Sequence, residues 1–220
     1  IRSPFFSLCD IQKWSSSLSL LLALALPLQV GLSVWCSRVH RLTRFLAPAL
    51  VERQNPSACF IIGNQQLPKE TADITNQIKD RISCNPRRTT LSGVPDVSSG
   101  GITFSSINFA TSSQTPLQFA LSRFATPTPL RNADLATFQK QLDVYLATEA
   151  GIRSVGGNLA IKLPKFFLQF QVSRIQTAQG NPPTAPGLQV NHLLEKVLKN
   201  APRESEELKN QVRALARILS

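Results

Sequence analysis

The sequence predicts an α+β protein: a small antiparallel sheet of about four to five strands packed by one central helix, preceded by an apolar leader helix and followed by a C-terminal helical hairpin. Three observations predict this class. A long segment near the start carries no charge, short runs alternate apolar and polar residues in the middle, and apolar residues recur at helical spacing toward the end. The corresponding parts are a leader at 1–53, an α+β domain at 54–178, a proline-rich linker at 179–187 and a helical hairpin at 188–220.

The leader contains an uncharged apolar segment, residues 14–37. About 20 helical residues cross a hydrocarbon core of about 30 Å, so this segment is long enough to span a membrane. A cleaved signal peptide fits its leucine-rich core but lacks a good cleavage site. A retained membrane anchor fits the basic residues that follow the segment, because the positive-inside tendency places such a basic flank on the cytoplasmic side. A buried core helix or mistranslated upstream sequence is the third alternative, since the chain begins at Ile1 and contains no methionine.

Four cysteines are present, and two of them, Cys59 and Cys84, fall in the α+β domain. A disulfide between them would close a loop and, by restricting the unfolded chain, would contribute on the order of 3 kcal/mol to stability. The alternative is two reduced, buried cysteines acting as small hydrophobes. Neither belongs to a C-x-x-C pair, so zinc or redox chemistry is disfavoured, and the pair favours export.

The first half of the domain predicts short strands and one helix. An apolar run at 59–62 is typical of a strand, and isoleucines spaced by four predict a helix at 69–82. Residues 89–116 are rich in Ser, Thr, Gly and Pro, which favours loops or short edge strands. Alternation beginning at Ile102 and again at 117–121 predicts two strands paired as a hairpin.

The second half predicts the central helix, at 132–150, capped by Asn132 and ended by Gly151. Alternation at 159–163 predicts another strand. Residues 166–172 predict the clearest strand, with Phe, Leu and Val on one face and Gln on the other. Two amphipathic helices then form the hairpin, the second starting at Pro202 with acidic residues early and basic residues late, as the helix dipole favours.

The chain is basic, with a net charge of +11 and a pI of about 10.2. The excess is not confined to the leader, because 18 basic and 11 acidic residues follow Arg53. A basic balance favours anionic partners, although general surface charge is the plain alternative. The candidate contacts to an anionic surface are Arg38, Arg41, Arg44, Arg87 and Arg88.

No catalytic or cofactor motif is present in the sequence, and no cofactor or metal is predicted. Only His40 and His192 exist, and no nucleophile and carboxylate lie near either in the sequence to suggest a triad. Arg87-Arg88 beside a Ser/Thr-rich loop would suit nucleic acid if aromatic side chains were exposed for stacking. The candidates, Phe104, Phe119, Phe124 and Phe170, fall instead on apolar faces, which favours the core.

The favoured function is therefore a non-enzymatic, membrane-associated or exported binding or assembly-support module. Its partner would be an anionic membrane surface or an acidic protein, located in the periplasm, a lumen or the cell envelope. A cytoplasm-facing anchor, a basic nucleic-acid-binding factor and an unrecognised hydrolase are the alternatives. The sequence does not fix the partner's identity or the oligomeric state.

Overall fold

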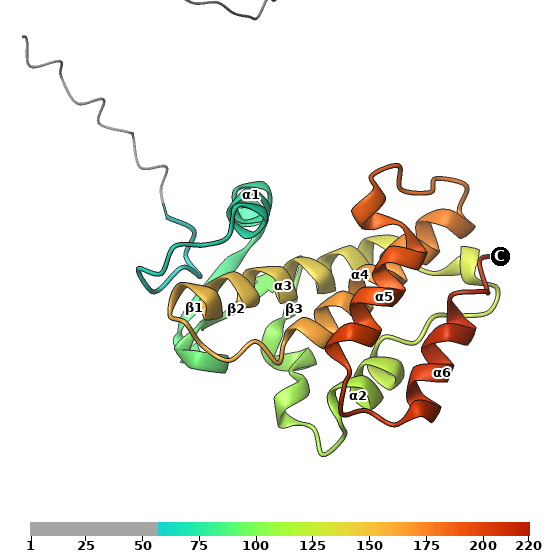
Figure 1. Cartoon of the computed structure of the whole chain (residues 1–220). Helices are drawn as coiled ribbons and strands as arrows, with labels where there is room; N and C mark the ends of the chain where they lie inside the picture. The colour runs from blue at the N-terminus through green and yellow to red at the C-terminus, as the bar shows by residue number, and fades with distance from the viewer. Residues whose placement is uncertain (1–56) are drawn as a thin grey trace, which may run out of the picture. The chain divides into compact units, whose positions relative to one another are not determined.

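The computed structural model describes residues 57–220. This part confirms the α+β class, with six helices and one three-stranded antiparallel sheet (Figure 1). The predicted leader helix, with Arg38, His40, Arg41 and Arg44 beside it, lies outside the described residues. The helices are α1 (Lys69–Ile78), α2 (Pro116–Arg123), α3 (Leu135–Ser154), α4 (Lys162–Ala178), α5 (Val190–Asn200) and α6 (Glu206–Leu215), and the strands are β1 (Ser83–Thr89), β2 (Pro95–Ser99) and β3 (Ile102–Thr103).

The sheet is smaller than the predicted four to five strands. Its order is β1-β2-β3, with Cys84 opposite Val97 and Ser99 opposite Ile102. Val97 is fully buried, and β2 packs against α3. Only the segment beginning at Ile102 supplies a predicted strand, and it lasts two residues before the chain turns into a 3-10 helix.

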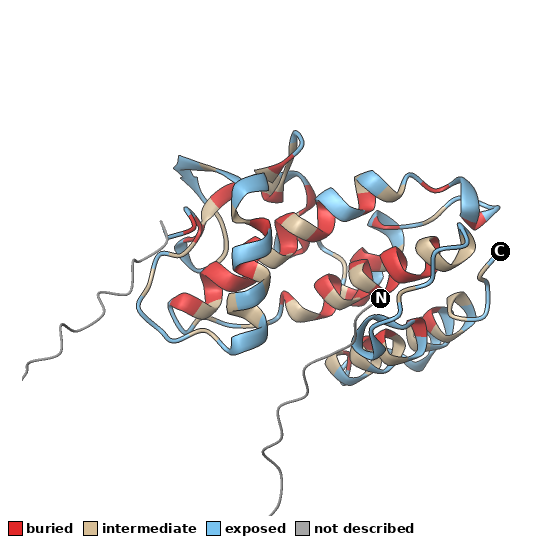
Figure 2. Ribbon diagram, turned by 90° about the horizontal axis from the view of Figure 1, so that it is seen from above, coloured by how far each residue is buried: buried red, intermediate tan, exposed pale blue. Residues whose placement is uncertain are grey.

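Helices α3 and α4 form the centre of the described unit and pack side by side (Figure 1). Figure 2 shows their buried residues running along both helices. The central helix was predicted correctly, but its ends differ. Asp134, not Asn132, caps α3 by accepting a hydrogen bond from the Thr137 amide at 3.2 Å. Gly151 does not end it, because α3 continues to Ser154.

Gly151 is needed for close packing rather than for stopping the helix. A Cβ there would lie 2.6 Å from the carbonyl oxygen of Phe60. The stop comes at Gly156, whose φ of 67° is a conformation that glycine adopts readily, and the amide of Gly157 donates back to Ile152 at 2.9 Å.

The strand predicted at 166–172 is wrong, because these residues form the middle of α4. Helix α4 is buried on nearly all sides, so apolar residues are accepted on every face of it. Alternation of apolar and polar residues therefore does not distinguish a strand from a helix in this segment. The strand at 159–163 is also wrong, since it is the turn that opens α4.

The hairpin predicted between the 102–109 and 117–124 segments is wrong as well. Residues 116–123 form α2, for which Thr115 caps the N-terminus and Pro116 occupies the first turn. Both are ordinary start signals of a helix, and they outweigh the alternation that follows.

The apolar run at 59–62 is not a strand but a turn that packs on the C-terminal end of α3. Phe60 is fully buried there. The amides of Ile62 and Gly63 both donate to the Ser154 hydroxyl, at 3.2 and 3.0 Å. The helix predicted from residue 69 is confirmed as α1 and is extended by a 3-10 turn, Lys79–Arg81.

The two C-terminal helices are confirmed, although α6 begins at Glu206 with Ser205 as its cap rather than at Pro202. Helix α5 packs against α4. The C-terminal end of α6 is bound by Arg174 of α4, which donates to the carbonyls of Leu215 and Ile218 at 2.8 and 2.9 Å. None of the helices within residues 57–220 combines the length and apolarity that crossing a bilayer requires.

Candidate ligand-binding groove

A groove follows the seam between α3 and α4. Its lining residues on α4 recur every three or four positions, so they form one continuous face of that helix. From Lys162 to Gln176 this face extends about 21 Å at 1.5 Å per residue. The α4 residues that line the groove are Lys162, Lys165, Phe166, Gln169, Val172, Ser173 and Gln176.

Helices α1 and α5 form the two walls of the groove (Figure 1). Two cavities make it up, of about 530 and about 890 Å³, a size typical of small-molecule sites. They adjoin, because five residues, Ile74, Leu146, Gln169, Leu188 and Leu193, line both.

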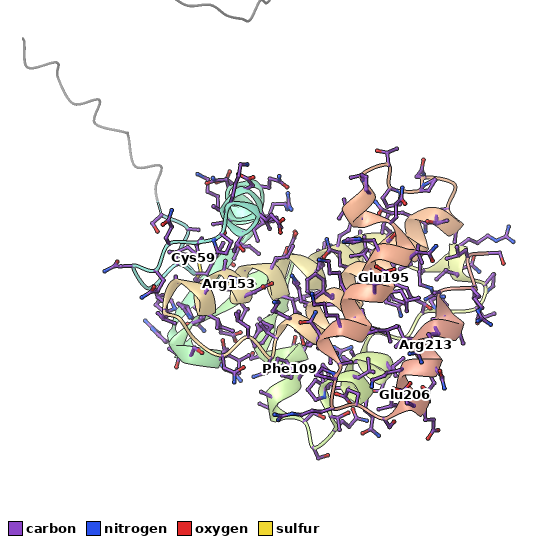
Figure 3. The ribbon with its side chains drawn as sticks, in the orientation of Figure 1. Cys59, Phe109, Arg153, Glu195, Glu206 and Arg213 are labelled. Carbon is purple, nitrogen blue, oxygen red and sulfur yellow. A yellow bond between two sulfur atoms is a disulfide. The ribbon has the colours of Figure 1, made fainter. Side chains whose placement is uncertain are left out.

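One end of the groove is rich in cations, and we call it the basic end. It is lined by Arg153, Lys162, Lys165, His192 and Lys196. Two carboxylates, Glu70 and Glu149, share it, so lysine and arginine outnumber acids there by two. In Figure 3, Arg153 is labelled on α3.

Glu149 is the buried anion of the basic end, with its side chain 5% exposed. Lys165 contacts it at 2.9 Å, and Arg153 contacts it at 2.7 Å. Burial raises the pKa of the Glu149 carboxyl, but the charge and hydrogen bonds of its two partners outweigh burial, so this pKa lies below its ordinary value of 4.5. Burial lowers the pKa of Lys165 from 10.5, and Glu149 only partly opposes that.

The remaining basic side chains of this end, Lys162, Lys196 and His192, are less engaged. Within residues 57–220, Lys162 and Lys196 have no carboxylate oxygen within 4.0 Å, and the His192 ring forms no hydrogen bond. All three side chains belong to residues of intermediate exposure. The basic end therefore offers positive charge to a ligand without first breaking an ion pair.

The rest of the groove is apolar at its base and uncharged along much of its rim. Its base includes Ile78, Leu142, Val172 and Leu193, each at most 9% exposed. Glutamines supply much of the rim, namely Gln77, Gln139, Gln169 and Gln176. The far end holds Arg81, which is paired with Asp143 through bonds of 3.0 Å, and the exposed Lys140.

Ser173 adds one unmatched polar atom to this apolar stretch. The residue is 2% exposed and lines the groove, yet its hydroxyl has no hydrogen-bond partner in the described structure. Buried polar atoms of folded proteins are nearly always paired, so this hydroxyl is an exception to the rule beside the groove.

Of the predicted site residues, Cys59 and Cys84 form the predicted disulfide, with their Cα atoms 6.1 Å apart. Arg87 and Arg88 lie exposed on β1, and Arg88 is 3.7 Å from Asp96. They do not line the groove, and their role as anionic-surface contacts stays a prediction. The domain boundaries also stay predictions.

The sequence reasoning missed the basic end and the groove. Lys162, Lys165, Gln169 and Val172 show helical spacing, but the strand assigned at 166–172 concealed it. His192, considered only as a catalytic residue, lies on the α5 wall. Among residues 57–220, no group of His, Cys, Asp and Glu side chains is arranged to hold a metal ion.

The fold and site define a helix-rich α+β domain with an amphipathic groove. The chain belongs to the family described as Domain of unknown function (DUF7143), whose model matches residues 61–220 and thus all four elements that line the groove. No curated protein and no solved structure matches the chain.

Proposed function

We propose that this protein is a non-enzymatic binding module, exported or membrane-associated, that holds its ligand in the groove between α1 and α5. The observation that carries the proposal is the groove itself, in which an apolar seam runs into a cation-rich end. Ligand sites are commonly apolar clefts with a few polar groups that fix orientation, and this groove has that composition.

The disulfide supports the exported setting. Disulfides persist in oxidising compartments and are rare in the cytosol. The Cys59–Cys84 bond closes a loop that contains all of α1, so it secures one wall of the groove to the sheet. The apolar segment at 14–37 supports the same setting as a targeting or anchoring element.

The nucleic-acid alternative has less support. Its stacking residues are in the core, since Phe104, Phe124 and Phe170 are at most 1% exposed. Phe104 and Phe124 each pack edge-on against Tyr145, with ring centroids 5.3 and 5.8 Å apart. Single-strand binders need such rings at the surface.

Binding in the groove is tested with Nile red, a neutral apolar dye whose fluorescence rises in apolar surroundings. We expect saturable binding at one site per protein and its loss in Leu188→Asp, because Leu188 lines both cavities. Ile218→Asp is the matched control, since Ile218 is similarly exposed (52% against 42%) but lies outside the groove. Equal dye binding by both variants would refute the groove as the site.

The setting is tested by fractionating cells that express the native chain and alkylating it without prior reduction. We expect recovery in a membrane or exported fraction, with Cys59 and Cys84 unlabelled because they are bonded to each other. Recovery wholly in the soluble cytosol with both thiols labelled would reject the exported or membrane-associated setting.

A further inference from the structure

Resting on the proposed function, we propose that the ligand is a free single-chain amphiphile with an anionic headgroup, its head at the basic end and its chain along the α3–α4 seam. Charge complementarity selects the headgroup, and the shape of the groove selects the chain.

The headgroup follows from the free cations of the basic end. Lys165 and Arg153 are already held by Glu149. Lys162 and Lys196 approach the same cavity from α4 and α5, and no carboxylate within 4.0 Å neutralises them in the described structure. An anionic group between them would replace water as their partner and would gain from the low polarity of the surroundings.

The single chain follows from the narrowness of the seam. Val172 and Leu193 line the groove but are 8% and 1% exposed. An α-helix with its side chains is about 10–12 Å wide, and a groove open enough for one would expose these residues far more. An extended chain is thin enough, and beyond the basic end the seam offers it about 15 Å of length along α4, from Phe166 to Gln176.

The α4 side of the seam also lacks the charges that would recognise a polar polymer. From Gln169 to Gln176 the lining side chains of α4 are neutral. Burial of methylene groups there contributes about 0.8 kcal/mol each, so the chain supplies affinity and the headgroup supplies orientation. The Ser173 hydroxyl lies about 12 Å along α4 from Lys165, beside the chain rather than the head.

The test compares three amphiphiles with the same dodecyl chain and different heads, each below its micelle concentration, by displacement of Nile red. Dodecanoate carries a negative head, dodecyl maltoside a neutral one and dodecyltrimethylammonium a positive one. We expect dodecanoate to bind at least tenfold more tightly than the other two, and its advantage to shrink at high salt.

The double variant Lys162→Ala with Lys196→Ala removes the free cations. We expect it to weaken dodecanoate at least tenfold while dodecyl maltoside is unchanged. Lys199→Ala is the matched control, because Lys199 lies on the same helix three residues from Lys196 and is exposed outside the groove. It should bind dodecanoate as the wild type does.

The outcomes separate the two proposals. Equal displacement by all three heads would overturn the anionic headgroup and leave groove binding intact, whereas absence of any Nile red binding would overturn the proposed function as well. If butanoate displaced Nile red as strongly as dodecanoate does, the proposal that a long apolar chain binds along the seam would be overturned. Binding to anionic phospholipid vesicles without binding of monomeric dodecanoate would overturn the free amphiphile in favour of a membrane surface.

Discussion

Helix α4 buries two cations, Lys165 and Arg174, and the protein satisfies them in different ways. Lys165 faces a carboxylate in a groove that solvent or a ligand can reach. Arg174 is 1% exposed and has no carboxylate within 4.0 Å; its guanidinium donates to Gln171 and to two backbone carbonyls at the end of α6. Burial lowers the pKa of Arg174 to about 10, so it still carries its charge near neutral pH.

The difference separates a structural cation from a candidate functional one. Each of the three guanidinium nitrogens of Arg174 donates one hydrogen bond, two of them to the end of α6 and one to Gln171, which itself donates to the carbonyl of Phe124. Lys165 shares its carboxylate with Arg153 and lies beside cations that have none. Three substitutions or conditions test this contrast, from the largest expected effect to the smallest.

Arg174→Met has the largest expected effect on stability. It removes the donor to the buried Gln171 amide oxygen, the side-chain donor to the Ile218 carbonyl and one of the two donors to the Leu215 carbonyl, at an expected loss of about 3 kcal/mol in the free energy of unfolding. Urea denaturation measures this loss. The control is Arg217→Met, because Arg217 is exposed and its substitution should change the free energy of unfolding by no more than about 0.5 kcal/mol. A loss no larger than that of the control would mean that Arg174 is not a structural cation.

Glu149→Gln should reduce stability less and change binding in the opposite direction. It leaves Lys165 without its counter-charge, but the groove gives solvent access to that ammonium, so we expect a loss of about 2 kcal/mol. The variant frees Lys165 and Arg153, so its folded form should bind dodecanoate more tightly than the wild type. Denaturation and displacement measure the two effects, with exposed Glu195→Gln as control (Figure 3). Weaker dodecanoate binding would contradict the assignment of the basic end.

The pH dependence should be the smallest effect. Because the pKa of Glu149 is lowered by folding, its contribution to stability is complete above the ordinary value of 4.5 and disappears as pH falls through the lower folded value. The stability difference between wild type and Glu149→Gln should therefore be full near pH 7 and shrink near pH 3. Denaturation at the two pH values measures it, and a difference independent of pH would assign the loss to packing.

The sequence predicted the amphipathic helices because each has one buried stripe. Helices α1, α5 and α6 pack by one face, so their apolar residues recur at helical spacing. It also offered the disulfide as one of two alternatives, since Cys59 and Cys84 are the two cysteines beyond the leader, and the structure has the disulfide. Helix α4 is buried on nearly all sides, so its apolar residues show no such periodicity and it was predicted as a strand. Because α4 forms the base of the groove, the groove was not predicted either.

The groove could not be predicted because four elements far apart in sequence build it. Lys162 and Lys196 come from different helices, and only the packing of α5 on α4 brings them to one cavity. Glu149 carries no sign in the sequence that it is buried, since a glutamate on a helix is usually solvated. Its burial depends on Lys165, which the strand assignment had left outside any helix.

The Cys59–Cys84 bond has a further consequence for limited proteolysis of this protein. A single cleavage of the chain anywhere between the two cysteines leaves two polypeptides that are still covalently joined. The segment they enclose includes α1, most of whose residues are at least partly exposed, and β1 follows directly. A nicked molecule would therefore run as one species on a non-reducing gel and as two after reduction, with the α1 wall still tethered to the sheet.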